Sequence, residues 1–237
     1  MASDHLPPRG MPAPGDALPA PSGGAPPGNR SVEDRRTELR VLFVVILAIL
    51  TLSGIAPYDR LTWTMEVSWV AVGLPVLILT YRRFPLTTLV YRLLFLHAII
   101  LIVGGYYTYA RVPLGFWFAD LFHLTRNYYD RLGHLAQGFI PALLAREILI
   151  RRSPLVGSAW LSFVVICICL AFSAFFELIE WWSALIMGAA ADAYLATQGD
   201  VWDTQADMLG ALIGAIAAVS LLSRMQDRQL ARLPVWR

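Results

Sequence analysis

Acidic side chains that stand beside long apolar runs are the most informative feature of this sequence. They gather between Phe175 and Gly214, in the segments F-F-E-L-I-E-W-W and T-Q-G-D-V-W-D-T-Q-A-D-M. The acidic residues of this stretch that we consider are Glu177, Glu180, Asp200, Asp203 and Asp207. A carboxylate next to hydrocarbon is costly unless it is paired, protonated or metal-bound, so such residues indicate a functional site by default.

The spacing of the polar residues predicts that they share helix faces. Asp130, His134 and Gln137 occur at i, i+4 and i+7, which places them on one face of a helix. Glu177 and Glu180 are separated by one turn. The three aspartates that follow occur at i, i+3 and i+7, so they also share a face if their helix begins early enough.

One histidine among several carboxylates supplies two kinds of chemistry. First, imidazole and carboxylate groups can bind a divalent metal. The candidate metal ligands are His134, Glu177, Glu180, Asp203 and Asp207. Three of them, His134, Glu177 and Asp207, are also candidates for acid–base catalysis, if burial or crowding of like charges shifts a pKa. The candidates for binding a ligand directly are Asp130, Arg131, Gln137, Asp200 and Arg126, and the arginines suit an anionic group. The spacing matches no established metal signature.

The overall composition indicates a membrane protein. Of the 237 residues, 57% are hydrophobic and 15% are charged, and the mean hydropathy is +0.57. A soluble domain carries about 25% charged residues. The chain contains no lysine, and its net charge of +2 is too small to indicate a nucleic-acid partner. Membrane lipids are the expected surroundings.

The apolar runs predict an all-α polytopic membrane protein with six transmembrane helices, because a helix needs about 20 residues to cross a bilayer. The runs cover residues 39–56, 65–81, 89–109, 131–150, 157–182 and 205–223. Around them we expect a disordered Pro/Gly/Ala-rich cytoplasmic tail over residues 1–29, a six-helix domain over 30–223, and an Arg-rich cytoplasmic tail over 224–237.

The arginines predict that both termini are cytoplasmic. With the N-terminus inside, the cytoplasmic segments hold Arg30, Arg35, Arg36, Arg40, Arg82, Arg83, Arg92, Arg146, Arg151, Arg152, Arg224, Arg228, Arg232 and Arg237. The outer segments hold Arg60, Arg111, Arg126 and Arg131. This excess on one side satisfies the positive-inside rule at every loop, and it places the polar residues described above at the outer face.

Structural interpretations of the same residues stay open. Asp203 and Asp207 suit the start of a helix, where carboxylates favour the positive end of the helix dipole. Gly210 and Gly214 form a G-x-x-x-G pattern that is typical of close packing against a neighbouring helix. The segment 116–118 (F-W-F) is expected to lie on the surface at the outer interface.

Three segments together resemble the YjdF-like family of bacterial inner-membrane proteins, a domain of unknown function. They are N-Y-Y-D-R-L-G-H-L-A-Q-G at 127–138, E-L-I-E-W-W, and T-Q-G-D-V-W-D-T-Q-A-D-M. The resemblance covers roughly residues 40–223 and implies a small helical bundle in the bacterial cytoplasmic membrane. It points to Asp130, Arg131, His134, Gln137, Glu177, Glu180, Asp200, Asp203 and Asp207, without giving them roles.

The last apolar run carries a shorter resemblance. D-T-Q-A-D-M-L-G-A-L-I-G is similar to the Asp-x3-Asn-x2-Gly-x3-Gly pattern of VanZ-like membrane proteins, some of which are linked to glycopeptide-antibiotic tolerance. Asp207 stands where that pattern has asparagine, which adds a titratable group. This resemblance implies a role in the cell envelope.

Three functions fit these observations. The first is a pocket at the outer face that binds a lipid or envelope-precursor head group, with or without a divalent metal, and enzymatic activity at this pocket is left open. The second is a small proton-coupled transporter, whose polar path would continue inward through Arg146 and Glu147. The third is a scaffold whose charges only fix the helices. Tight pairing of every carboxylate would favour the scaffold, and unpaired carboxylates around a cavity would favour the pocket.

Overall fold

The computed structural model, which describes residues 29–188 and 192–233, confirms the all-α class, since no strand occurs within those residues. The long helices are α1 (Asn29–Ser53), α2 (Arg60–Thr80), α3 (Thr88–Tyr107), α5 (Tyr129–Arg152), α6 (Ala159–Met187) and α8 (Asp203–Leu230). The short ones are a 3-10 turn (Tyr109–Arg111), α4 (Pro113–Phe122) and α7 (Asp192–Leu195). The expected disordered tail lies outside the described residues except for Asn29. Helix α8 includes residues 224–230, the first part of the expected C-terminal tail.

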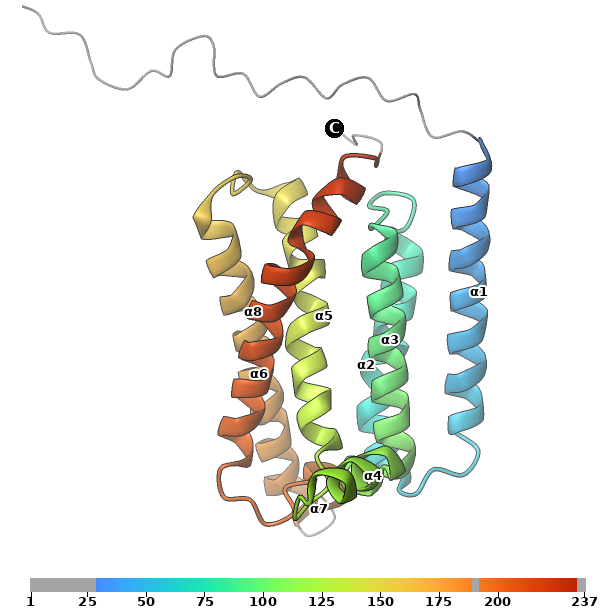
Figure 1. The fold of residues 1–237 in the computed structure, drawn as a ribbon. Coiled ribbons are helices and arrows are strands. Elements are labelled where there is room, and N and C mark those ends of the chain that lie inside the picture. Colours follow the sequence, from blue (N-terminus) through green and yellow to red (C-terminus); the bar gives the residue numbers. More distant parts are fainter. Residues whose placement is uncertain (1–28, 189–191, 234–237) are drawn as a thin grey trace, which may run out of the picture.

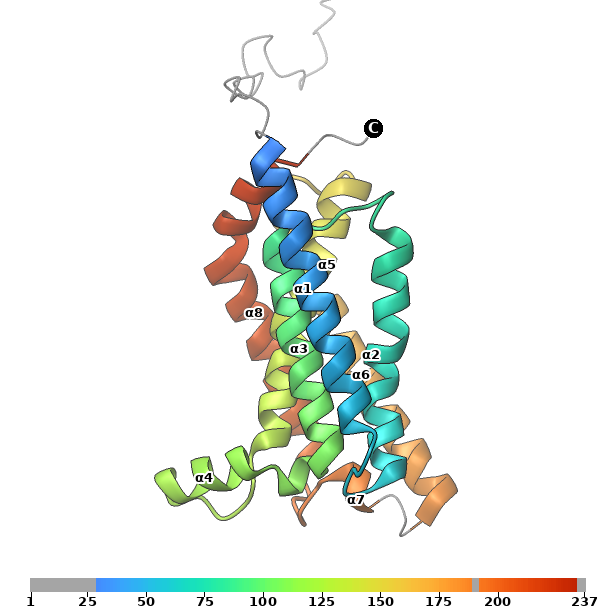
Figure 2. The ribbon, with the colours of Figure 1, turned by 90° about the vertical axis from the view of Figure 1, so that its right-hand side faces the viewer.

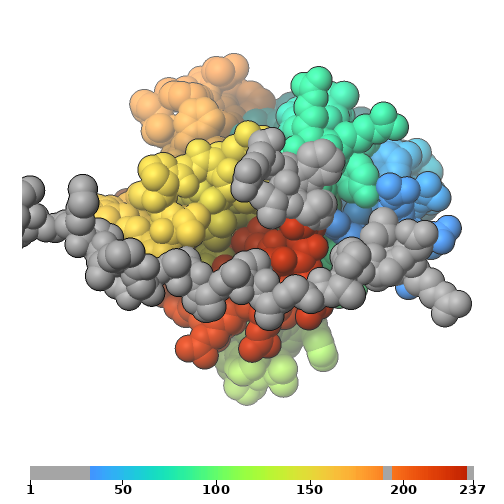
Figure 3. Space-filling model, turned by 90° about the horizontal axis from the view of Figure 1, so that it is seen from above, coloured from blue at the N-terminus to red at the C-terminus, as the bar shows by residue number. Residues whose placement is uncertain are grey.

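The long helices stand side by side in a bundle, and α4 and α7 lie across one end of it (Figure 1). The start of α1 and the end of α8 both lie at the other end (Figure 1). From the side, α4 projects outward from the bundle (Figure 2), and its aromatic residues Phe116, Trp117 and Phe118 are exposed as expected. From above, α1 and the segment joining α5 to α6 lie at opposite margins of the bundle (Figure 3).

Four of the long helices, α2, α3, α6 and α8, are long and apolar enough to cross a membrane by length and composition. Helices α1 and α5 carry more charge. Helix α5 nevertheless packs against α3, α6 and α8, so it occupies the interior of the bundle. Its buried residues include Asp130, His134, Arg146 and Glu147, which shows that protein, not lipid, surrounds these charges.

Small residues bring α5 and α8 close together. A Cβ atom at Gly138 would collide with the backbone carbonyl of Ala211, and one at Gly214 would collide with that of Leu135. A Cβ at Gly210 would meet only ordinary contacts, the nearest at 3.6 Å. The close packing expected at the G-x-x-x-G pattern is therefore present at Gly214 but not at Gly210. The other glycine at which the two helices approach closely is Gly138, on α5.

A buried polar network joins α5 to α3 at the end of the bundle where α5 finishes. The carboxylate of Glu147 accepts hydrogen bonds from the backbone N–H of Thr87 at 3.0 and 3.1 Å and from its hydroxyl at 2.8 Å. Arg151 donates to the same carboxylate at 3.1 Å. Because Thr87 is the N-cap of α3, Glu147 satisfies donors that the start of a helix leaves free.

Candidate functional site

The starts of α5 and α8 and the last turns of α6 bring most of the sequence-predicted site residues together. Helix α5 carries Asp130, Arg131, His134 and Gln137, and packs against both other helices. Two carboxylates come from α6 and two aspartates from α8, while Asp200 lies in the loop before α8. The three segments that are distant in sequence therefore form one polar region.

Part of this region is a network of ion pairs. Arg126 bonds to Asp200 at 2.9 Å and to Asp203 at 3.0 Å. Arg131 bonds to the same two aspartates at 3.0 and 2.6 Å, and also pairs with Asp207. The backbone N–H of Trp202 donates to Asp200, and this bond and the two arginines lower the pKa of Asp200. These contacts anchor the start of α8 to the start of α5.

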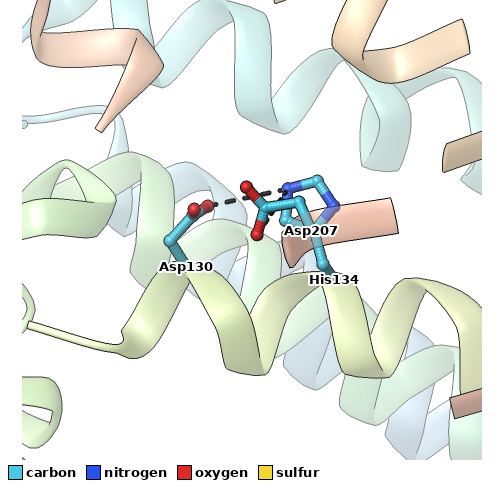
Figure 4. Close-up of side chains that lie close together, drawn as sticks. All are labelled: Asp130, His134 and Asp207. Atoms are coloured by element: carbon cyan, nitrogen blue, oxygen red, sulfur yellow. Dashed lines mark ion pairs between the residues drawn. The ribbon is translucent and has the colours of Figure 1, made fainter. Parts of the chain in front are cut away.

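A second part surrounds the imidazole of His134 (Figure 4). Its Nε2 atom lies 3.7 Å from an oxygen of Asp130, 3.7 Å from one of Glu177 and 3.8 Å from one of Asp207. One ligand atom each from Asp130, His134 and Asp207 fall within 4.8 Å of one another, and all three residues are buried. Phe176 packs against the imidazole with the ring centroids 5.7 Å apart.

The structure adds a residue that the sequence interpretation missed, Glu66 of α2. Glu66 is 3% exposed and lines the same cavity as Asp130 and His134. The sequence did contain an indication of this residue, because the segment W-T-M-E-V-S-W-V has a single acidic residue near the start of an apolar run. Among the described residues, neither Glu66 nor Glu180 has a cationic partner within 4.0 Å, although both are buried.

A cavity of about 450 Å³ extends from these polar groups between α2, α3, α5 and α6. Its polar wall consists of Glu66, Asp130, His134, Gln137, Tyr109 and His97. The remaining wall is apolar and includes Trp69, Leu101, Leu144, Ile148, Ile168, Phe172, Phe175 and Phe176. The cavity is therefore amphipathic, with carboxylates and an imidazole in the polar part and aromatic and aliphatic side chains along the rest.

The predicted site thus divides into two groups. Asp130, His134, Glu177 and Asp207 converge on one point, with Gln137 along the cavity. Arg126, Arg131, Asp200 and Asp203 instead bind one another. The arginines that were expected to receive an anionic ligand are each engaged by aspartates. Asp207 and Asp130 connect the two groups, because Asp207 pairs with Arg131 and Asp130 lies 3.5 Å from it. Glu180 is buried and belongs to neither group.

The fold and its buried polar site define an integral membrane protein with a helical bundle, and comparison with known proteins places it more closely. The family model described as "Predicted membrane protein (DUF2238)" matches residues 38–228, and the chain belongs to this family. The chain is 53% identical over 189 residues to the inner membrane protein YjdF of Escherichia coli (strain K12), covering 80% of this chain and 90% of that protein.

This similarity confirms the YjdF-like resemblance and supports a location in the inner membrane. No solved structure matches the chain significantly.

Proposed function

We propose that this protein binds an amphiphile, a lipid or envelope precursor, with its polar head group at the His134 cluster and its hydrocarbon in the adjoining cavity. The observation that carries this proposal is that one cavity is lined at once by buried carboxylates and by a long apolar wall. Ligand sites commonly combine an apolar lining with a few convergent polar groups that fix orientation.

The distribution of charge favours a binding site over a purely structural role. In a scaffold, we would expect an arginine or backbone donors for each buried carboxylate. Asp200 and Asp203 fit that description, since both have two guanidinium partners. Glu66 and Glu180 do not, and among the described residues the only basic side chain within 4.0 Å of Glu177 is the imidazole of His134. Buried carboxylates without a cationic partner are costly for stability, so their presence around a cavity favours function.

The arrangement of the inner residues gives no support to a transporter. Arg146 and Glu147 were the candidates for the inner half of a polar path. Glu147 is engaged by Thr87 and Arg151, and Arg146 pairs with Asp227 at 2.7 Å and bonds to Gln226 at 3.0 Å. Both residues are thus used to join α5 to α3 and α8.

We also propose that six helices cross the membrane and that both termini are cytoplasmic. Beyond the four helices that qualify by composition, α5 can cross because its charges are enclosed by α3, α6 and α8. Helix α1 has 25 residues and is long enough to cross, with its apolar residues 41–53 in the hydrocarbon and the charged residues before them at the interface. The start of α1 and the end of α8 lie at one end of the bundle, which agrees with an even number of crossings (Figure 1). The arginine excess assigns that end to the cytoplasm.

Reporter fusions test this topology. Green fluorescent protein fused after Arg152 or after Arg237 is expected to fluoresce, because it folds in the cytoplasm. Alkaline phosphatase fused after Asp59 or after Leu124 is expected to be active, because it requires the periplasm. Each site receives both reporters, so that each fusion has its own control. Active alkaline phosphatase after Arg237 would contradict the proposed orientation.

Amphiphile binding is tested by filling the cavity. Leu144 of α5 lines the cavity, whereas Leu132 of the same helix is 39% exposed and does not. We expect Leu144→Trp to weaken lipid binding about 10-fold, because overpacking a filled site costs about 1–3 kcal/mol. The measurement is native mass spectrometry of detergent-purified protein titrated with phosphatidylglycerol and with a polyprenyl phosphate.

Leu132→Trp is the matched control and should bind like the unaltered protein. Tighter binding of the polyprenyl phosphate would identify an envelope precursor as the ligand, and tighter binding of phosphatidylglycerol would identify a membrane lipid. If neither compound binds, or if both variants bind equally well, the proposed function is wrong.

A further inference from the structure

The geometry around His134 points to a metal site: we propose that Asp130, His134 and Asp207 hold one divalent cation, with Glu177 beside it. Two of these residues lie one turn apart on α5, one comes from α8 and one from α6. The site is therefore formed only when the three helices pack. Asp130 and His134 also line the cavity, and Figure 4 shows their side chains next to that of Asp207.

The distances fit ligands around an ion better than hydrogen bonds. A hydrogen bond from an imidazole to a carboxylate is about 2.7–3.2 Å long, and the three distances from His134 Nε2 are 3.7, 3.7 and 3.8 Å. Ligand atoms at about 2.1 Å from a tetrahedral metal lie about 3.4 Å from one another. The spacing is therefore close to that of a metal's ligand shell, and a small inward movement completes it.

The charges around this point favour a cation. The buried carboxylates of this region are Glu66, Asp130, Glu177, Glu180, Asp203 and Asp207, with Asp200 partly exposed at the margin. The guanidinium groups that pair with them are those of Arg126 and Arg131. Arg126 binds Asp200 and Asp203. Arg131 binds the same two aspartates and Asp207, and it also lies 3.5 Å from Asp130. The carboxylates of the region still outnumber these two guanidinium groups. A divalent ion at this position offsets the excess of negative charge.

Unpartnered atoms in the cluster give independent support. His134 is 4% exposed, and its Nδ1 atom has no hydrogen-bond partner among the described residues. The Oε1 atom of Glu177, which is the oxygen nearest to His134, likewise has none. Buried polar atoms are normally hydrogen-bonded. The carboxylate oxygens surround Nε2 of His134, so the unpartnered Glu177 oxygen is placed as a ligand, whereas Nδ1 is the other ring nitrogen. The Asp207 oxygen nearest to Nε2 also pairs with Arg131, so an ion here would share that oxygen with the guanidinium group.

The donor set selects the class of ion. Imidazole suits first-row transition metals, whereas carboxylates also suit harder ions such as Mg²⁺, Ca²⁺ and Mn²⁺. One imidazole with two or three carboxylates therefore favours Mn²⁺, Fe²⁺ or Zn²⁺ over Mg²⁺ or Ca²⁺, which prefer oxygen ligands alone. The role of the ion in binding rests on the proposed function: it would hold an anionic phosphate head group in a region whose own arginines are engaged.

The test is metal binding by the intact protein in detergent. After removal of bound metal with a chelator, Mn²⁺ or Zn²⁺ is added, and melting temperature and bound metal are measured by thermal unfolding and elemental mass spectrometry. A ligand that binds only the folded state raises its stability. We expect one ion per chain and a higher melting temperature. His134→Gln should weaken binding at least 10-fold, since changes to groups that merely support metal ligands already cost about 10–100-fold.

His97→Gln is the matched control, because His97 lines the same cavity but has no carboxylate within 4.0 Å among the described residues. It should bind the ion as the unaltered protein does. If His134→Gln does not fold, Asp130→Asn replaces it. Absence of stabilisation by either ion, or equal affinity in the His134 and His97 variants, would overturn the metal site.

The outcome for the metal is independent of the outcome for the lipid. The Leu144→Trp and Leu132→Trp variants are titrated with lipid both in the presence of a chelator and with the ion added, so that the cavity is tested in both states. If Leu144→Trp binds lipid more weakly than Leu132→Trp but the protein binds no metal, amphiphile binding is supported and the metal site is refuted. If the protein binds metal but the two variants bind lipid equally well, the metal site is supported and amphiphile binding is refuted.

Discussion

Replacing Arg131 by methionine is expected to destabilise the bundle by about 3–5 kcal/mol, the cost of removing one partner from a buried ion pair. The Arg131 side chain is only 16% exposed, and it pairs with Asp200, Asp203 and Asp207. Its loss leaves several negative charges together in the protein interior with Arg126 alone to offset them. Methionine keeps much of the length of the side chain, so the change isolates the charge. The measurement is thermal unfolding in detergent.

Arg92→Met provides the comparison. Arg92 pairs with Glu38 at 2.5 Å, but its side chain is 62% exposed. An exposed pair contributes about 0–1 kcal/mol, so this variant should unfold close to the unaltered protein. Adding Asp203→Asn to Arg131→Met should restore part of the stability, because it removes one of the stranded charges. The explanation fails if the Arg131 and Arg92 variants unfold alike, or if Asp203→Asn gives no recovery.

The long helices could be predicted from the sequence, because an apolar run of about 20 residues is enough to indicate a membrane-spanning helix. Each predicted apolar run corresponds to one long helix, although the ends differ. Helix α6 continues through Met187, beyond the expected end at residue 182. The polarity of α5 was visible in the sequence, but its central position was not, because that depends on contacts with α3, α6 and α8. Hydropathy measures composition and does not distinguish a charge that faces lipid from one that faces protein.

The sequence indicated which residues form the candidate site, but not which of them pair with arginine and which surround His134. Spacing alone placed Asp130 and His134 on one face, and the structure brings both next to Asp207. Which carboxylates are paired with arginine depends on how α8 is rotated against α5, and sequence spacing within each helix cannot fix that rotation. For this reason Arg126 was expected to bind a ligand, whereas it binds Asp200 and Asp203.

The partners of the inner polar residues could not be predicted, for a related reason. Arg146 and Glu147 near the end of a predicted span were candidates for a transport path. Glu147 instead caps the start of α3 through Thr87, a contact between residues 60 positions apart in the chain. The sequence shows that Glu147 is an acidic residue near the end of a predicted span, but no local pattern indicates that its partner is the start of α3.

The contact between α5 and α8 leads to the second prediction with a large effect. Gly214→Ala is expected to destabilise the protein by at least the 1–3 kcal/mol typical of overpacking. The new methyl group would meet the backbone carbonyl of Leu135, with the backbone N of Phe139 only 2.8 Å away. Backbone atoms of a helix cannot move aside as a side chain can, so the two helices must separate. Gly138→Ala should act in the same way against Ala211.

Gly210→Ala, one turn from Gly214 on the same helix, distinguishes this contact from a general intolerance of alanine. Its methyl group would meet the Cβ of His134 at 3.6 Å, an ordinary packing distance. Alanine also favours helix by about 1 kcal/mol over glycine, so Gly210→Ala should leave stability unchanged or raise it. Because separation of α5 and α8 also moves Asp207 away from His134, Gly214→Ala should weaken metal binding and Gly210→Ala should not. Equal melting temperatures for the two variants would show that the close approach of α5 and α8 does not hold this bundle together.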